Sequence, residues 1–227
     1  MRRVARIFSV ALITAGLVVL ADAGATVAWK EPLSSLYSSF RQRAADDQLD
    51  ALRDDFLIDP AVTGLDPDQD DAARAAKLAD LFAKRLEEGK GIGRIEIPSI
   101  DADYVVVEGT GTADLQKGPG HYPETALPGQ GRSIGIAGHR TTYGAPFNRI
   151  DGIDVGDEIT LELPYGKFTY RVTDTKIVDP SDVEIVDDVG RERLILTACH
   201  PLYSAAQRYA VFADLKGVTA TPSGDGA

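Results

Sequence analysis

The sequence predicts a mostly β domain, built as a closed barrel or a sandwich, that follows an N-terminal helical region. From Gly91 onward, short segments rich in β-branched and aromatic residues succeed one another and are separated by turn residues. Residues 31–58 and 70–88 instead repeat apolar residues every three to four positions, the spacing of a helix. The first 29 residues carry a long apolar run behind three arginines.

The composition limits the chemistry that this chain can perform. Its 227 residues suffice for one medium-sized domain with accessory segments. A net charge of −11 argues against nucleic acid as a partner, because phosphate binding requires a basic surface. The single cysteine, Cys199, can form neither an internal disulfide nor a multi-cysteine metal site, and the three histidines lack a metal-binding spacing. We therefore expect no metal and no cofactor.

The N-terminus predicts export. Three arginines within the first six residues precede the apolar run Ile7–Leu20, which continues in weaker form to Trp29. Basic residues before an apolar segment stay in the cytoplasm, so the rest of the chain is expected outside it. A cleaved signal peptide is one interpretation, since Ala21-Asp22-Ala23 resembles a cleavage site. We favour a retained transmembrane anchor over residues 1–29, which makes a single-pass protein of the cell membrane.

Residues 30–89 form the second predicted region, a charged helical stalk or linker. Two helical patterns are interrupted by the proline, glycine and aspartate residues of 59–71, and the second pattern ends at Gly89. In one interpretation the region holds the following domain away from the membrane. In the other it is a regulatory segment that covers a site. We favour the stalk.

The β-rich domain is expected over residues 90–217. Its predicted strands are Ile92–Ile100, Tyr104–Val107, Ser133–Ala137, Glu158–Leu163, Phe168–Val172, Lys176–Val178, Val183–Val186, Arg193–Ala198 and Tyr209–Leu215. Short helices are expected at Ala113–Gln116 and Pro146–Ile150. The tail 218–227 consists mostly of small and polar residues and is expected to be disordered.

Cys199 is the first candidate for chemistry. It ends an apolar strand candidate and is followed by His200-Pro201. Since proline ends the strand, the thiol is expected at the C-terminal end of that strand. A buried and inert cysteine is the alternative, because cysteine is among the most often buried residue types. An unpaired cysteine outside the cytoplasm, beside polar residues, favours a reactive thiol.

Two further residues could act with that thiol. Arg208 opens the next strand candidate, nine positions later. If the two strands pair, its guanidinium returns to Cys199, where it would stabilise a thiolate or an oxyanion. His139 ends the apolar segment Ile136–Gly138 and is the candidate proton carrier that a cysteine nucleophile needs. Taken singly, an arginine or a histidine is more often an ordinary surface or core residue.

The ordered set of motifs resembles the sortase family. The matching residues are IPSI (97–100), GPGHYPETALPG (118–129), AGHR (137–140) and TACHP (197–201) with an arginine nine positions after the cysteine. In wording they are similar to class E sortases, with class D as neighbour. The resemblance covers about Gly91 to Lys216. It implies an eight-stranded sortase-type β-barrel with short helices, preceded by a transmembrane helix and a helical stalk.

The resemblance also implies a role for individual residues. Cys199 would be the nucleophile, His139 the general acid and base, and Arg208 the residue that binds substrate and stabilises the oxyanion. The candidate substrate-binding residues are Thr197, Tyr143 and His121. His200 is not expected to be the base, because adjacent side chains of a strand point to opposite faces.

The implied function is that of a cysteine transpeptidase. It would cleave an LAXTG- or LPXTG-like sorting signal between Thr and Gly, form a thioester, and pass the acyl group to the amine of a peptidoglycan precursor, which anchors surface proteins to the cell wall. L,D-transpeptidases and papain-like peptidases fit less well, because their cysteine and histidine motifs are arranged differently. A second class of function stays open: an exported, membrane-anchored β domain with a binding role, in which Cys199 is buried and structural.

Overall fold

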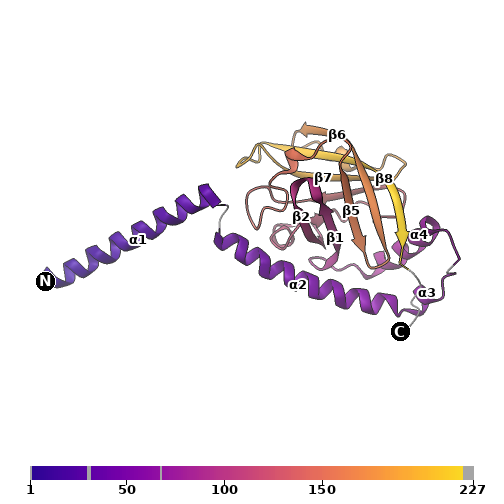
Figure 1. Cartoon of the computed structure of the whole chain (residues 1–227), viewed down its shortest axis with the longest axis horizontal. Coiled ribbons are helices and arrows are strands. Elements are labelled where there is room, and N and C mark those ends of the chain that lie inside the picture. Colours follow the sequence, from indigo (N-terminus) through magenta and orange to yellow (C-terminus); the bar gives the residue numbers. More distant parts are fainter. Residues whose placement is uncertain (1, 30–31, 67, 222–227) are drawn as a thin grey trace.

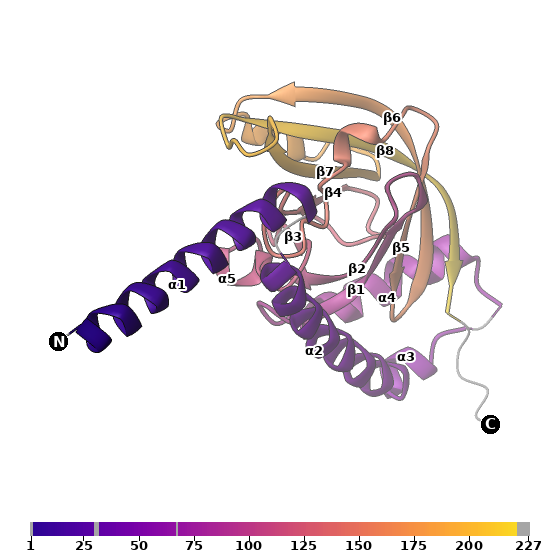
Figure 2. The same ribbon diagram turned by 60° about the vertical axis from the view of Figure 1, so that its left-hand side comes forward.

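The computed structural model describes residues 2–29, 32–66 and 68–221 (Figure 1). In this part of the chain a β-barrel carries two helices against its wall, α2 (Pro32–Leu57) and α4 (Asp71–Phe82). The N-terminal helix α1 (Arg2–Trp29) projects away from the barrel in both views (Figures 1 and 2). A shorter helix, α3 (Pro60–Thr63), connects α2 to the segment before α4.

The described strands close into one eight-stranded barrel in the order β1-β2-β3-β4-β7-β8-β6-β5. Most neighbouring strands are antiparallel, whereas β4 runs parallel to β7 and β2 runs parallel to β3. The strands are β1 (Gly91–Ile97), β2 (Ala102–Glu108), β3 (Gly120–His121), β4 (Ser133–Ala137), β5 (Glu158–Leu163), β6 (Gly166–Val178), β7 (Arg193–His200) and β8 (Gln207–Ala220).

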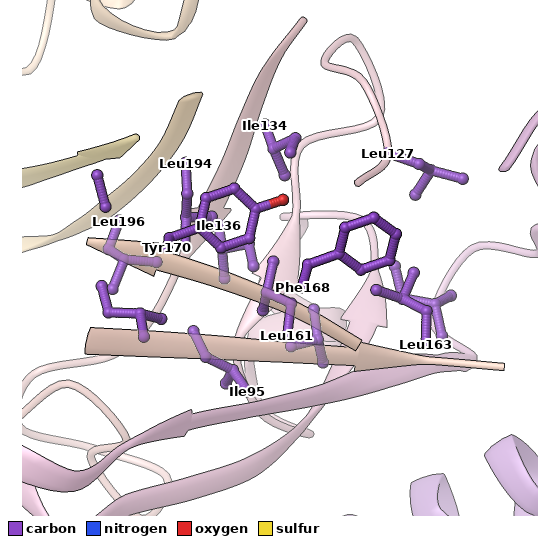
Figure 3. Close-up of a cluster of buried hydrophobic side chains, with 14 of the residues drawn as sticks. Ile95, Leu127, Ile134, Ile136, Leu161, Leu163, Phe168, Tyr170, Leu194 and Leu196 are labelled. Carbon is purple, nitrogen blue, oxygen red and sulfur yellow. The ribbon is translucent and has the colours of Figure 1, made fainter. Parts of the chain in front are cut away.

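Alternating side chains fill the barrel (Figure 3). Leu161 and Leu163 of β5 are buried, while Glu162 between them is exposed. This two-residue period is the expected pattern for a strand with one face on a core. Phe168 and Tyr170 of β6 continue the same core. Because the barrel is closed, it has no hydrogen-bonding edge of the kind that open sheets must protect.

Several predicted elements differ from the structure. The segment predicted as strand Val183–Val186 is a 3₁₀ helix, η4, whose apolar residues pack on the outside of the barrel and do not pair with another strand. The predicted helix Pro146–Ile150 is a series of turns that leads into the 3₁₀ helix η3 (Ile150–Gly152). The predicted strands Phe168–Val172 and Lys176–Val178 are parts of one longer strand, β6.

The expected tail also differs in part. β8 continues to Ala220, which pairs with Gly166, so residues 218–220 belong to the barrel. Residues 222–227 lie outside the described part. The remaining short elements are α5 (Thr112–Leu115), η1 (Ala83–Arg85) and η2 (Pro98–Ile100).

The helices of residues 30–89 complete the barrel core. Phe56 of α2 and Phe82 of α4 are fully buried, with ring centroids 5.3 Å apart, and Phe82 lies 5.4 Å from Tyr165. Asp70 caps the start of α4 by accepting hydrogen bonds from two backbone amides of its first turn. Helices α2 and α4 therefore pack on the barrel, whereas the sequence analysis expected a stalk that holds the domain away from the membrane.

A glutamine fixes α2 along the barrel wall. The side-chain amide of Gln42 donates to the carbonyls of Val105 (3.0 Å) and Lys117 (2.6 Å), and its Oε1 accepts from the backbone amide of Val105 at 2.8 Å. Arg94 of β1 adds an ion pair with Asp46 at 2.6 Å. These contacts hold the middle of α2 against β1 and β2.

The predicted anchor over residues 1–29 coincides with α1. The described apolar side chains of this helix are exposed, including Ile7 (71%) and Leu20 (70%). Among the residues that the structure describes, no helix combines the length and the apolarity that crossing a bilayer requires. The transmembrane part of the prediction is therefore not shown by the structure.

Replacing Phe82 with alanine tests whether residues 30–89 stabilise the barrel. We expect Phe82→Ala to lower the free energy of unfolding by about 3–5 kcal/mol, because the lost ring leaves a cavity between α4 and the barrel. Urea unfolding measures this change. Phe40→Ala on the exposed face of α2 is the control, with an expected change below about 0.5 kcal/mol. Equal effects of the two substitutions would contradict the docking of α4.

Candidate active site

Cys199 and Arg208 lie directly opposite each other in the antiparallel pair of β7 and β8. Side chains at opposed positions of such a pair lie on the same face and close together. Both residues are half-buried. The register of the two strands therefore places Cys199 and Arg208 side by side on one face of the barrel wall.

The thiol belongs to the outer face of the barrel wall. Leu194, Leu196 and Ala198 belong to the interior core, so the alternate residues of β7 face outward. On that outer face Ile195 is opposite Phe212, and Thr197 is opposite Ala210. Cys199 and Arg208 are the next opposed pair on this face. They lie at the rim of the barrel, which is the end of the barrel where β7 stops.

His139 is brought to the same rim by the parallel pairing of β4 with β7. Ala137 is in register with Thr197, and the backbone amide of Gly138 donates to the carbonyl of Thr197 at 3.0 Å. Position 138 requires glycine, because an added Cβ would lie 2.4 Å from the ring of Phe147. His139 therefore follows β4 at the level where Cys199 follows Thr197 on β7.

The imidazole of His139 is half-buried. Its Nε2 atom is buried and has no hydrogen-bond partner among the described residues. The ring of Tyr143 covers it, with centroids 5.1 Å apart. Burial disfavours the charged imidazolium and lowers the pKa of His139 below its ordinary value. At neutral pH this histidine is therefore mainly uncharged and able to accept a proton.

The loop that follows His139 is conformationally strained. Tyr143, Gly144 and Ala145 all have positive φ angles, of 51°, 76° and 45°. This region is unfavourable for residues with a side chain, and such strain persists only where the surroundings enforce it. Ser38 of α2 lies close to Gly144, and the hydroxyl of Tyr143 accepts from Nε2 of Gln116 at 3.3 Å. The structure thus places Tyr143 against the candidate base.

A cavity of about 90 Å³ adjoins Arg208 and Thr197. Its apolar wall is formed by η4, and Tyr122 closes it with a hydroxyl 3.0 Å from Oγ1 of Thr197. The guanidinium of Arg208 donates to the carbonyls of Ala205 and Gln207, both at 3.0 Å. Sequence reasoning did not include Tyr122 among the site residues. The sequence did carry a signal for Tyr122. It directly follows the candidate His121, and because adjacent side chains of an extended segment point to opposite faces, only one of the two can face the site.

His121 is placed differently from the other candidates. It is 2% exposed, its Nδ1 lies 2.8 Å from Oε2 of Glu108, and its Nε2 lies 3.0 Å from the carbonyl of Ala126. Both ring nitrogens are thus engaged by the protein, and His121 does not line the cavity beside Thr197. Its substrate-binding role stays a prediction that the geometry does not support.

The remaining histidine lies behind the strand. Nδ1 of His200 is 2.9 Å from Nη1 of Arg140, a buried arginine on the opposite side from the thiol. In the described part of the chain, no cluster of three or more His, Cys, Asp or Glu residues could hold a metal ion. The side chains that the strand register gathers at the rim are a thiol, an imidazole and a guanidinium.

Tyr143→Ala tests whether the tyrosine ring desolvates His139. We expect the pKa of His139 to rise toward the ordinary histidine value of about 6.5, because water would then solvate the imidazolium. An NMR titration of the histidine ring protons measures it, and only three histidines need assignment. The exposed Tyr203 provides the control substitution, Tyr203→Ala, with no expected change. A His139 pKa that stays constant or falls in Tyr143→Ala would contradict this account.

Known proteins share this architecture. A family model described as a sortase domain matches residues 95–216, more than half of the chain. Sortase D of Bacillus subtilis is 41% identical over 130 residues, which cover 56% of this chain and 64% of that protein. Sortase SrtE2 of Streptomyces coelicolor is 30% identical over 223 residues, which cover 90% of this chain and 79% of that protein.

A solved structure gives the same result. The structure of sortase E from Streptomyces avermitilis has 36% sequence identity and a TM-score of 0.54, and the match covers 59% of this chain and 93% of that chain. The eight-stranded closed barrel described above agrees with this likeness. With a family model over most of the barrel, and relatives of classes D and E among the matches, the chain belongs to the sortase family.

Proposed function

We propose that this chain is a cysteine transpeptidase that anchors surface proteins to the cell wall. The observation that carries the proposal is the strand register, which pairs Cys199 with Arg208 while β4 brings His139 to the same rim. Family membership supports it independently. The reaction needs no cofactor, since nucleophile, proton carrier and oxyanion donor are all side chains of this chain.

Acylation is the first proposed step. The thiol of Cys199 gives its proton to the uncharged His139, and the thiolate attacks the carbonyl carbon of the Thr–Gly bond. The carbonyl oxygen becomes negative and accepts hydrogen bonds from Arg208. When the carbonyl re-forms, the C–N bond breaks and its electron pair remains on the glycine nitrogen, which takes the proton from His139. The downstream peptide leaves, and a thioester at Cys199 remains.

Deacylation reverses the roles. The amine of a peptidoglycan precursor attacks the thioester carbonyl and loses a proton to His139. Arg208 again stabilises the oxyanion, the C–S bond breaks, and the new amide leaves the site. The sulfur departs as thiolate and is reprotonated by His139. The low pKa of His139 suits this exchange, because an uncharged imidazole can accept the proton of the thiol and, later, that of the amine.

The proposed substrate is the sorting signal of surface proteins, of the LAXTG or LPXTG kind. The cavity beside Thr197 supports this choice, because its η4 wall of Val183, Ile185 and Val186 offers an apolar surface for the leucine of the signal. Arg208 borders the same cavity and ends beside the thiol, so a bound peptide would reach Cys199 from it. The similarity to class E and class D sortases favours the same class of peptide.

Membrane attachment through residues 1–29 is part of the proposal. The supporting observation is the sequence of α1, in which arginines precede an apolar run whose described side chains are exposed. This arrangement would keep the N-terminus in the cytoplasm and the barrel outside the cell. A thiol at the rim would there meet both sorting signals and cell-wall precursors.

A binding domain with a structural cysteine is the alternative function. It requires Cys199 to be sealed in the core, but Cys199 is half-buried and faces outward at the end of β7. The family match also does not favour this alternative.

Peptide cleavage tests the proposed chemistry. Fluorogenic LAXTG and LPXTG peptides with an added amine should yield both the free downstream peptide and the amine-linked product. Cys199→Ala should abolish turnover, and Arg208→Ala should lower kcat about 100- to 1000-fold, because one oxyanion donor is lost. Both variants should keep the melting temperature within about 3 °C, since both side chains are half-exposed at the rim. Near-normal transpeptidation by Arg208→Ala would refute its assigned role.

Fractionation tests the anchor. The full chain expressed in a Gram-positive host should remain in the membrane after carbonate extraction, and a chain without residues 2–29 should not. External protease should digest the barrel of intact protoplasts. Mass spectrometry of the mature protein decides between the two interpretations of the N-terminus. A chain that begins near residue 24 would show cleavage of a signal peptide and exclude the retained anchor.

A further inference from the structure

Arg140 is a buried cation next to the candidate base. Arg140 is 4% exposed, although it lies in the loop between β4 and η3. Nη2 forms an ion pair with Oδ2 of Asp151 at 2.5 Å, and Nε donates to the carbonyl of Asn148 at 3.3 Å. Both partners belong to the segment after His139, so this segment curves around the guanidinium of Arg140.

The third group of contacts reaches the strand of the nucleophile. Nη1 of Arg140 lies 2.9 Å from Nδ1 of His200 and 3.5 Å from the carbonyl oxygen of Cys199. A guanidinium can only donate hydrogen bonds, so Nδ1 of His200 must accept. Arg140 thus connects the loop of His139 to the last two residues of β7.

These contacts lie on the side of β7 away from the substrate. Cys199 belongs to the outward face, and the side chain of the next residue, His200, points to the opposite face. Arg140 approaches from that opposite face, so it neither contacts the cavity beside Thr197 nor lies in the path of a peptide to the thiol. Any effect of Arg140 on the reaction must therefore act through other residues.

The loop is also closed by bonds that return to Arg140 and its neighbour. Nδ2 of Asn148 donates to the carbonyl of Arg140 at 2.8 Å, and the amide of Phe147 donates to the carbonyl of His139 at 3.0 Å. The backbone of His139 is set by the bond between Gly138 and Thr197, and the loop that follows it is tied to β7 by the Arg140 contacts.

We propose that Arg140 is a positioning residue that fixes the imidazole of His139 relative to the sulfur of Cys199 by bonding His200 and the Cys199 carbonyl from behind β7. The inference rests on the proposed function of the same site. Arginine suits this role because its planar fork donates in several fixed directions at once. A lysine has one ammonium group and could not keep the contacts with Asp151, Asn148 and His200 together.

The test compares two buried arginines by substitution with methionine. Arg140→Met removes the connection to β7. Arg74→Met is the matched control, because Arg74 is 3% exposed and also donates to backbone carbonyls, those of Asp66 and Thr221, in contacts that involve none of the site residues. For each variant, melting temperature, kcat and KM for a cleavable sorting-signal peptide are measured well below the melting temperature.

The expected result is a split between stability and turnover. Both substitutions should lower the melting temperature. Only Arg140→Met should lower kcat, by about 10- to 100-fold with KM within about twofold, because a misplacement of about 1 Å costs that much in rate and leaves peptide binding intact. Arg140→Lys should recover only a minor part of kcat. If folded Arg140→Met keeps wild-type kcat, or if Arg74→Met loses as much, Arg140 is merely structural and the inference fails.

A second variant keeps the inference testable if Arg140→Met does not fold. His200→Ala removes the acceptor on β7 and leaves Arg140 with Asp151 and Asn148. Its kcat should fall while KM and the melting temperature change little, because His200 is half-buried at the barrel end. An unchanged kcat in His200→Ala would overturn the inference. By contrast, a folded wild-type chain that cleaves no peptide would overturn the proposed function itself.

Discussion

The backbone pairing of β7 with its two neighbours is the interaction on which the site depends. β7 lies between β4 and β8 in the barrel, so one strand fixes both partners of the thiol. A slip of one residue against β8 would separate Cys199 from Arg208 and move every outward side chain of β7 inward. The buried leucines Leu194 and Leu196 prevent such a slip, because their exposure to water would cost several kcal/mol. The core therefore determines the chemistry at the rim.

The segments outside the barrel wall have specific places in this arrangement. η4 covers the outer face of β7 and β8, where Ile185 and Val186 pack around Ile195 and Phe212. This packing buries Ile195 and Phe212, whereas Thr197 and Arg208, nearer the end of β7, line a cavity. The outer face of β7 and β8 is thus apolar where η4 packs on it and polar near the end of β7. A peptide with an apolar first residue and a scissile bond near its end matches that division.

Sequence patterns predicted β4 and β5 with the bounds that the structure shows, β5 from its clean alternation and β4 from its short apolar composition between turn residues. The same patterns mistook η4 for a strand, since Val-Glu-Ile-Val has strand composition whether it pairs or covers a surface. The two-residue strand β3 is too short to produce a period. The Cys199 and Arg208 pair followed from the spacing of strand candidates. The contacts of Arg140 join its own loop to the distant end of β7 and leave no pattern in the sequence.

The packing of α2 against the barrel helps to maintain the strained loop after His139. Left-handed conformations at Tyr143 and Ala145 each cost about 1–3 kcal/mol, and the unpartnered Nε2 of His139 adds a further cost. These costs persist because contacts elsewhere in the fold oppose relaxation of the loop. Ser38 of α2 lies against Gly144, and Gln42 one turn later bonds the barrel wall. The helix that the sequence presented as a spacer thus borders the loop that packs on the base, and Gln116 and Tyr104 hold the same loop from the barrel side.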